Sequence, residues 1–268
     1  MNIDSSYVSP YSVSEINQTS LEKIGTALKI NKASEDASDL VIASQLGSTR
    51  DSLSQAVENM NSGIAMSNIA QSGLSDQKEI LESIRTETLK AMNGTTNQDG
   101  KDIIAQTINK SIEQFDAITQ STTYNGTSLL KTDGDTSDDI SIVDNQSTIE
   151  LEKSDTSSIS NTLKSLMNNF STDISVQTNL LNVIDQSIDQ LNTFESNFSG
   201  ASNVMESSIK NSISTEKELA NAESTIMDID YSKESSSFSK TNLLSQIGLM
   251  MQSQANATQG KNISLLSY

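Results

Sequence analysis

Apolar residues recur at every third or fourth position from Leu40 to Met92, a stretch much longer than an average globular helix. This spacing predicts one continuous helix of about fifty residues, roughly 80 Å long at 1.5 Å per residue. Pro10 is the only proline, so the rest of the chain lacks the strongest helix breaker. A long helix in a bundle buries only a narrow apolar stripe, which suits a hydrophobic fraction of 34%. We therefore expect an elongated bundle of long amphipathic helices.

Further helices are predicted from the same spacing. A helix after the turn at 93–100 has four apolar residues on one face: Ile104, Ile108, Ile112 and Phe115. Another helix, from about Leu180 to Met227, contains the strongest heptad repeat of the chain, with Leu181, Ile184, Ile188, Leu191, Phe194, Phe198, Met205 and Ile213. The segment 228–231 interrupts the pattern, and a last helix rich in Leu and Met is expected from Phe238 to Ala257.

The middle of the chain has a different periodicity. Residues 140–143 and 149–152 partly alternate between apolar and polar side chains around 144–147, which predicts a β-hairpin. Residues 156–175 are rich in Ser and Thr and are compatible with one short helix through Leu163 and Leu166. The predicted fold class is therefore mainly α, with a small β-hairpin region in the middle.

Side chains that carry catalysis are scarce. The chain contains no histidine and no cysteine, which excludes Ser-His-Asp triads, thiol nucleophiles and thiolate or imidazole metal sites. The acidic run from Asp133 to Asp139 does not fit a calcium-binding loop and is expected to be a solvated turn. Asp228 and Asp230, beside the predicted helix break, are expected to cap helices or form a turn. We predict that the protein is not an enzyme and needs no cofactor or metal.

The net charge of −18 limits the possible partners. Such an acidic surface repels nucleic acid and anionic lipid, and no apolar run is long enough to cross a membrane. Residues 1–20 have no secretory signal pattern and are expected to be disordered in a monomer. Copies of the chain also repel one another, so any polymer must bury enough apolar surface to overcome this, with help from salt.

Apolar stripes at both ends, with no catalytic group between them, indicate assembly rather than catalysis. The expected regions are an N-terminal assembly segment (1–33), a long helical hairpin of the core domain (34–130), a β-hairpin and Ser/Thr-rich loop region (131–178), a third long core helix (179–227) and a C-terminal assembly helix (228–268). Met250 and Met251, among nearby leucines, are expected to belong to an interaction surface rather than a core.

Several segments resemble the bacterial flagellin family, in order along the chain. Residues 28–43, LKINKASEDASDLVIA, resemble the family segment GLRINSAxDDAAGxAIA. Residues 59–69 are similar to NANDGISIAQ, 81–85 to LQRVR, and 122–126 to TQFNG.

The resemblance continues at the other end. Residues 222–231 resemble ARSRIEDxDYA, and the stretches 239–248, 254–256 and 264–266 are similar to the closing flagellin helix. The resemblance implies a subunit that is exported unfolded through the flagellar type III apparatus with a chaperone. It would polymerise with itself outside the cell, beneath a filament cap and next to hook-associated proteins. Its terminal segments would be disordered in the monomer and helical after assembly.

On this basis the expected self-assembly residues lie in both terminal segments: Leu21, Ile24, Leu28, Leu243, Leu244, Ile247, Leu265 and Leu266. The segment before Leu28 is shorter than is usual in the family, and Pro10 lies where a continuous terminal helix would run. These departures leave an alternative function open, an accessory or secreted flagellin-like protein (a minor or junction subunit) that does not polymerise alone.

Arg85 has three possible roles. It is either part of a solvated helix face or an intersubunit contact, and it matches the arginine that flagellins present to the vertebrate innate flagellin receptor. Thr86 and Glu87 differ from the family pattern at that site, and Thr107 replaces an expected glutamate. The resemblance therefore implies weak activation of the receptor. The Ser and Thr residues between Thr132 and Thr178 are possible O-glycosylation acceptors, as in other flagellins, or simply a polar loop surface.

Overall fold

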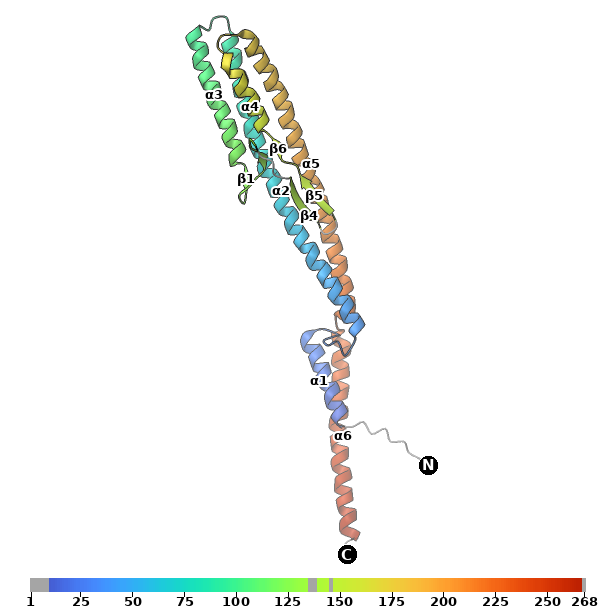
Figure 1. The fold of residues 1–268 in the computed structure, drawn as a ribbon. Helices are drawn as coiled ribbons and strands as arrows, with labels where there is room; N and C mark the ends of the chain where they lie inside the picture. The colour runs from blue at the N-terminus through green and yellow to red at the C-terminus, as the bar shows by residue number, and fades with distance from the viewer. Residues whose placement is uncertain (1–9, 135–138, 145–146, 267–268) are drawn as a thin grey trace. The chain divides into compact units, whose positions relative to one another are not determined.

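The computed structural model describes residues 10–134, 139–144 and 147–266, and it is mainly helical, as the sequence predicted (Figure 1). The α-helices are α1 (Pro10–Thr26), α2 (Ala37–Met92), α3 (Gln98–Ser121), α4 (Ser157–Leu166), α5 (Ile174–Met227) and α6 (Tyr231–Leu266), with a 3₁₀ turn at Met167–Asn169. The strands are β1 (Thr123–Tyr124), β2 (Thr127–Ser128), β3 (Leu130–Lys131), β4 (Ile140–Asp144), β5 (Ser147–Leu151) and β6 (Ser154–Asp155).

The chain divides into two compact units. The central unit comprises residues 52–215, and the terminal unit comprises residues up to 51 together with those from 216 onwards. Within the central unit, α2, α3, α4 and α5 run alongside one another (Figure 1).

An apolar seam between α2 and α5 forms the axis of the central unit. In the central unit, the buried positions of α2 alternate in steps of three and four residues at 53, 56, 60, 63, 67, 70, 74, 77, 81, 84, 88 and 91, with Gly73 buried beside them. The buried positions of α5 have the same spacing: 177, 180, 184, 187, 191, 198, 205 and 212, with half-buried residues at 194 and 201. A repeat of 3.5 residues keeps one stripe of each helix facing its neighbour over many turns.

Helices α3 and α4 complete this core. Ile108, Ile112 and Phe115 of α3 are at most 1% exposed, which confirms the predicted face. Gln77 of α2, also fully buried, donates hydrogen bonds to Thr119 Oγ1 (2.8 Å) and to the Phe115 carbonyl (3.3 Å) of α3. Thr119 Oγ1 lies 3.0 Å from Thr156 Oγ1, just before α4. These bonds pair the Gln77 side-chain nitrogen and the two threonine hydroxyls and tie three segments together, whereas the buried Gln77 Oε1 has no partner among the described residues.

The β-hairpin covers one part of the α2–α5 seam. Strands β4 and β5 pair antiparallel, with Ile140 opposite Leu151 and Ile142 opposite Ile149, which confirms the predicted hairpin. Ile142 packs with Met60 of α2 and Met205 of α5 in a small apolar cluster. The alternating side chains of the hairpin thus place one apolar face on the helices.

Several helix boundaries differ from those expected. Helix α5 begins at Ile174 rather than near Leu180. At this start the Asp173 carboxylate accepts a hydrogen bond from Ser175 N–H (2.8 Å). Helix α6 runs from Tyr231 to Leu266, longer at both ends than the predicted 238–257. Both missed starts are polar turns, in which an aspartate cap replaces the apolar periodicity used for the prediction.

The position of Pro10 in α1 and the exposure of Ile213 also differ from the expectation. Pro10 is the first residue of α1, a position that tolerates proline because its missing N–H would have no helical partner. Ile213 was expected in the buried stripe of α5 but is 51% exposed, because the seam register places Ser212 inside instead.

Gly63 permits the close approach of the hairpin and α5 to α2. A Cβ atom at this position would lie 2.2 Å from Ile142 Cδ1 and 2.5 Å from Met205 Sδ, two side chains that are themselves buried. We predict that overpacking in Gly63→Ala costs the central unit about 2–3 kcal/mol. This exceeds the roughly 1 kcal/mol that alanine gains over glycine in a helix, so the net destabilisation is about 1–2 kcal/mol.

Gly200→Ala on α5 is the matched control, because no atom lies within 4 Å of the added Cβ. Urea denaturation of both variants checks the prediction, and the control should be as stable as the original protein or more so. Equal stability of the two variants would show that the seam is not tightly packed at Gly63.

Candidate functional site

Helices α1 and α6 lie side by side in the terminal unit (Figure 1). The covered face of α1 includes Asn17, Ser20 and Ile24, which are half-buried or buried at i, i+3 and i+7 spacing. Leu21, by contrast, is 53% exposed, and Ile16 is 50% exposed. The structure therefore separates two residues that the sequence placed in one stripe, with Ile24 on the covered face and Leu21 outside it.

Helix α6 buries very little of its own surface. Among its described side chains, residues 231–255 and 257–258, none is classed as buried. Six of its apolar side chains are at least half exposed: Leu243 (59%), Leu244 (54%), Ile247 (50%), Leu249 (56%), Met250 (72%) and Met251 (70%). We call these six residues the α6 apolar row. The predicted residues Leu265 and Leu266 end this helix, but their side chains lie outside the described residues.

The charge of α6 differs from that of the remaining chain. Residues 231–266 contain three lysines and one glutamate, a net charge of +2, and no carboxylate side chain occurs after Glu234. The rest of the chain therefore carries −20. The α6 apolar row thus lies in a segment free of the negative charges that would repel another copy of this protein.

The connections at the ends of α1 and α5 are joined by backbone hydrogen bonds. Leu28 forms an antiparallel bridge with Asp228, and Lys29 N–H donates to the Met227 carbonyl (2.6 Å). Ile229 N–H donates to the Ala27 carbonyl (3.2 Å), with Ala27 in the left-handed region at φ 60°. We call residues 27–36 with 228–230 the connector pair. It fixes the end of α1 next to the start of α6.

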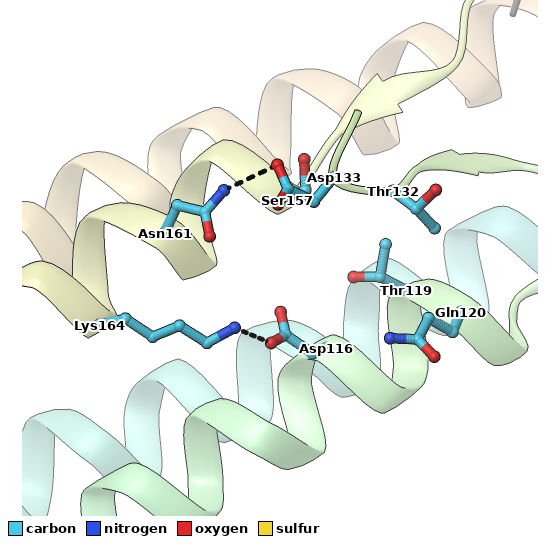
Figure 2. A pocket seen from close by; sticks show the side chains of 8 residues that line it. All are labelled: Asp116, Thr119, Gln120, Thr132, Asp133, Ser157, Asn161 and Lys164. Atoms are coloured by element: carbon cyan, nitrogen blue, oxygen red, sulfur yellow. Dashed lines mark hydrogen bonds and ion pairs between the residues drawn. The ribbon is translucent and has the colours of Figure 1, made fainter. Parts of the chain in front are cut away.

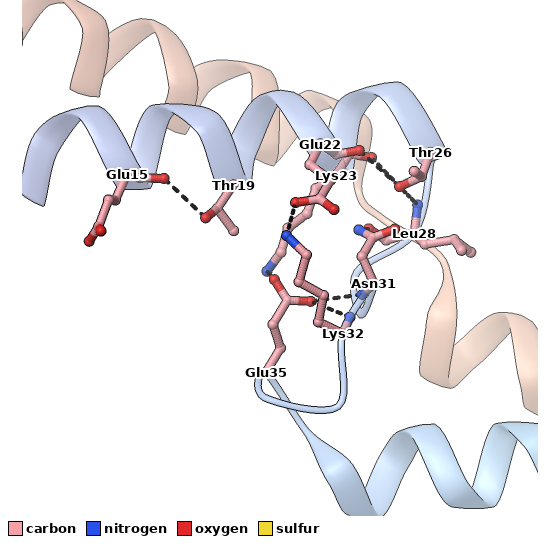
Figure 3. Close-up of polar contacts among 9 residues, drawn as sticks. All are labelled: Glu15, Thr19, Glu22, Lys23, Thr26, Leu28, Asn31, Lys32 and Glu35. Atoms are coloured by element: carbon pink, nitrogen blue, oxygen red, sulfur yellow. Dashed lines mark hydrogen bonds and ion pairs between the residues drawn. The ribbon is translucent and has the colours of Figure 1, made fainter.

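Charged side chains hold the first segment of the connector pair, residues 27–36, in place (Figure 3). The Glu35 carboxylate accepts hydrogen bonds from the backbone N–H groups of Asn31 (2.7 Å) and Lys32 (3.4 Å). Lys23 lies 3.7 Å from Glu35, and Lys32 lies 2.6 Å from Glu22. The Asn31 N–H donor, followed by the charge of Lys23, holds the pKa of Glu35 below its usual value.

Asp36 and Asp230 cap the starts of α2 and α6, and the role of Asp230 was predicted from the sequence. Asp36 accepts hydrogen bonds from Ser38 and Asp39 N–H, both at 3.0 Å, at the start of α2. Asp230 accepts from Lys233 N–H (3.0 Å) at the start of α6. Asp228 accepts a hydrogen bond from the Ser224 hydroxyl. These aspartates therefore have structural partners and are not arranged for acid–base chemistry.

Arg85 pairs within its own chain. Its Nη2 atom lies 3.3 Å from Asp185 Oδ1 of α5, and the two side chains are 42% and 51% exposed. An exposed ion pair of this kind contributes little to stability, about 0–1 kcal/mol. The guanidinium keeps a free, accessible side, so the pair is compatible with a contact to another molecule.

A small polar cavity of about 140 Å³ lies between α3, α4 and the segment after β3 (Figure 2). Its charged side chains are already paired, since Lys164 bonds to Asp116 and Asn161 donates to Asp133 (3.2 Å). Across the described residues, no three His, Cys, Asp or Glu side chains are grouped to hold a metal ion. Part of the acidic run, residues 135–138, lies outside the described residues.

Sequence reasoning missed two exposed apolar residues in the terminal unit. Val41 and Ile42, in the first turns of α2, are 68% and 46% exposed. Neither residue lines the neighbouring cleft of about 420 Å³, whose walls come from α2 and α5 and include Leu40, Ala43 and Met227. Their signal was present in the sequence as four consecutive apolar residues, Leu40 to Ala43, which a single helical stripe cannot bury.

None of the described helices is long and apolar enough to span a membrane.

Comparison with known proteins gives consistent matches. The family model for the bacterial flagellin N-terminal helical region matches residues 12–134, and that for the bacterial flagellin C-terminal helical region matches residues 181–266. A flagellin of Halalkalibacterium halodurans is 30% identical over 257 residues, covering 93% of this chain and 91% of that protein. A flagellin of Bacillus subtilis is 26% identical over 283 residues, covering 93% and 92%.

The fold also resembles a solved structure. It matches that of a "putative flagellar hook-associated protein" from Vibrio parahaemolyticus with a TM-score of 0.51 at 13% identity, covering 73% of this chain and 97% of that chain. At this identity the likeness concerns the fold alone.

Glu35 gives the connector pair a pH dependence. A carboxyl group whose pKa is lowered by folding stabilises the folded state above its ordinary pKa of 4.5, and that contribution disappears as pH falls through the lowered value. We predict that Glu35→Gln, which removes the charge at constant size, speeds hydrogen exchange at the Asn31 amide about fivefold near neutral pH, since about 1 kcal/mol is lost.

Glu15→Gln is the matched control, because the Glu15 side chain is exposed and makes no hydrogen bond or ion pair with another described residue. It should leave exchange at Asn31 unchanged. An equal effect of both substitutions would show that general charge, rather than the Glu35 hydrogen bond, protects the connector.

Proposed function

This chain belongs to the bacterial flagellin family, and we propose that it is a structural subunit of the flagellar filament that assembles through its paired terminal helices. The observation that carries the proposal is the α6 apolar row, six exposed side chains on a helix with no buried described side chain. Members of this family are structural proteins, so the function requires no catalytic centre.

Burial of the α6 apolar row supplies a driving force for assembly. Full burial of a Leu, Ile or Met side chain stabilises by about 1.5–3 kcal/mol, and these side chains are roughly half covered already. Covering the rest would therefore contribute about 1 kcal/mol per residue. In a polymer each copy both provides and receives such a surface, so the gain is repeated at every subunit.

Charge decides where copies can approach most closely. A chain with a net charge of −18 repels its copies, but residues 235–268 contain no Asp or Glu. Contacts through α6 therefore bring together the least repulsive segments of the chain. Since salt screens the remaining repulsion, assembly should increase with ionic strength.

The proposal includes the route by which the subunit reaches the filament. We infer export as an unfolded chain through the flagellar export apparatus with a flagellin chaperone, and assembly beneath a cap beside hook-associated proteins. This places the working protein in the extracellular filament. The family match supports this route, and the absence of cysteine removes the risk of disulfide cross-links outside the cell.

Alanine substitutions test the self-assembly residues of α6. We predict that Leu243→Ala combined with Leu244→Ala abolishes or strongly reduces polymerisation while the central unit stays folded, because the driving force lies in the exposed row. Leu265→Ala with Leu266→Ala should have the same effect. Sedimentation after a salt step with sheared filament seeds measures assembly, and circular dichroism measures folding.

The control removes comparable exposed apolar surface elsewhere, through Val204→Ala with Ile213→Ala on α5, where the side chains are 53% and 51% exposed. This control should polymerise normally. Normal filaments from the α6 variants would contradict the proposed surface. A wild-type chain that stays monomeric with seeds would instead favour the accessory or junction subunit.

Arg85 remains a candidate for contact with the innate flagellin receptor. We predict weak activation in a reporter-cell assay relative to a flagellin with the full family motif, because Thr86, Glu87 and Thr107 differ from that motif. The pairing of Arg85 with Asp185 also engages part of the guanidinium. Full potency of the purified monomer would contradict this prediction.

A further inference from the structure

In the turn between α2 and α3, the Asn93 side chain bonds to the residue two positions further on, across Gly94. Asn93 directly follows the last residue of α2 and is exposed. Its side-chain oxygen Oδ1 accepts two hydrogen bonds from Thr95, one from the backbone N–H (3.2 Å) and one from the hydroxyl (3.0 Å). Thr96 N–H donates to the Asn93 carbonyl (2.9 Å), which closes the turn. The side-chain amide is thus polarised by two donors.

The next residue supplies an unhindered nucleophile. Gly94 has no side chain, and a Cβ built there would meet no atom within 4 Å. Among the described residues, none accepts a hydrogen bond from the Gly94 N–H. The Gly94 backbone nitrogen, two bonds from the Asn93 Cα, is therefore neither shielded by a side chain nor held by a hydrogen bond.

We propose that Asn93 is a self-modification site, at which the Gly94 backbone nitrogen attacks Cγ of Asn93 to form a cyclic succinimide. The new N–Cγ bond replaces the bond from Cγ to the side-chain nitrogen, which leaves as ammonia and carries away the proton of the Gly94 N–H. Water then opens the ring. Cleavage at Cγ gives aspartate, and cleavage at the backbone carbonyl gives isoaspartate. No oxidant or reductant is needed.

Thr95 assists the slow step by stabilising the charge that develops on Oδ1. When nitrogen adds to Cγ, the side-chain oxygen becomes an oxyanion, and donors already placed on that atom favour the tetrahedral intermediate. Both Thr95 donors are within hydrogen-bonding distance before the reaction begins. Their effect is smaller than in an enclosed active site because water competes at an exposed turn.

The chain contains a second Asn-Gly pair, Asn125-Gly126, whose glycine is equally open, with no atom within 4 Å of a built Cβ. Unlike Asn93, Asn125 accepts no hydrogen bond at its side-chain oxygen from the described residues, and its backbone is held in a tight turn. Asn125 and Gly126 form the turn between β1 and β2, both in the left-handed region at φ 48° and 81°, with Tyr124 paired to Thr127. This two-residue turn holds its backbone in one conformation. Rotation of the Asn125 backbone toward the attacking geometry would break the strand pairing. We therefore expect Asn125 to be stable in the folded protein.

Conversion of Asn93 changes both charge and backbone. Either product adds one negative charge to a chain that already carries −18. Isoaspartate also adds one atom to the backbone, so the Thr96–Asn93 hydrogen bond that closes the turn cannot keep its geometry. The modification would consequently loosen the connection between α2 and α3, next to Asn97, whose side chain caps α3 by accepting from Gly100 N–H (2.9 Å).

Peptide mapping by mass spectrometry after incubation of the folded, full-length protein at mildly alkaline pH tests the proposal. We expect Asn93 to convert to aspartate and isoaspartate much faster than Asn125, with the succinimide seen on the way. Thr95→Val, which keeps the shape and the backbone donor but removes the hydroxyl, should slow conversion roughly three- to tenfold. Thr95→Ser should restore the rate.

Two controls make the result decisive. In denaturant the two Asn-Gly sites should react at similar rates, and the effect of Thr95→Val should disappear, because the turn no longer exists. Circular dichroism shows that each variant is folded before incubation. Equal rates at Asn93 and Asn125 in the folded protein, or an unchanged rate in Thr95→Val, would overturn the proposal.

Discussion

The central unit depends on one interaction, the seam between α2 and α5. Its buried positions follow a 3.5-residue repeat through both helices, so each helix needs only one stripe of residues that exclude water. Several stripe positions are small or polar, including Gly63, Ser67 and Ser187. They allow close approach, and larger residues such as Met60 and Phe198 fill the space between them. The hairpin, α3 and α4 all pack on this seam, which explains how a chain with 34% hydrophobic residues forms a core.

The terminal unit lacks such a seam. Ser20, Ile30 and Ala43 are its buried residues among those described, whereas α6 leaves its apolar row exposed. Backbone pairing between Leu28 and Asp228, and the hydrogen bonds of Glu35, position α1 and α6 without burying much apolar surface. A segment of this kind gains most of its stability from what packs against it. We therefore infer that other copies of the chain complete the terminal unit, and the lack of carboxylates beyond Glu234 makes close packing of copies possible.

Strong periodicity and turn chemistry made much of this fold predictable. The end of α2 at Met92, the β4–β5 hairpin and the capping aspartate Asp230 were all anticipated, because each rests on a local pattern. Local sequence patterns predicted burial wrongly where the packing of a neighbouring helix determines which residues are covered. The choice of Ser212 over Ile213 for the seam depends on the register of the partner helix, and Leu21 and Ile24 were separated by the position of α6. The role of Glu35 was missed since its partners are backbone groups of an irregular segment.

Hydrogen–deuterium exchange along residues 231–266, before and after salt-induced assembly with sheared filament seeds, tests the central claim most directly. Our account predicts rapid exchange of α6 in the monomer, strong protection in the filament, and unchanged protection along the α2–α5 seam. Equal protection of α6 in both states would mean that its stability comes from within the chain. Filaments in which α6 stays unprotected would mean that assembly uses another surface, and either result would contradict the account.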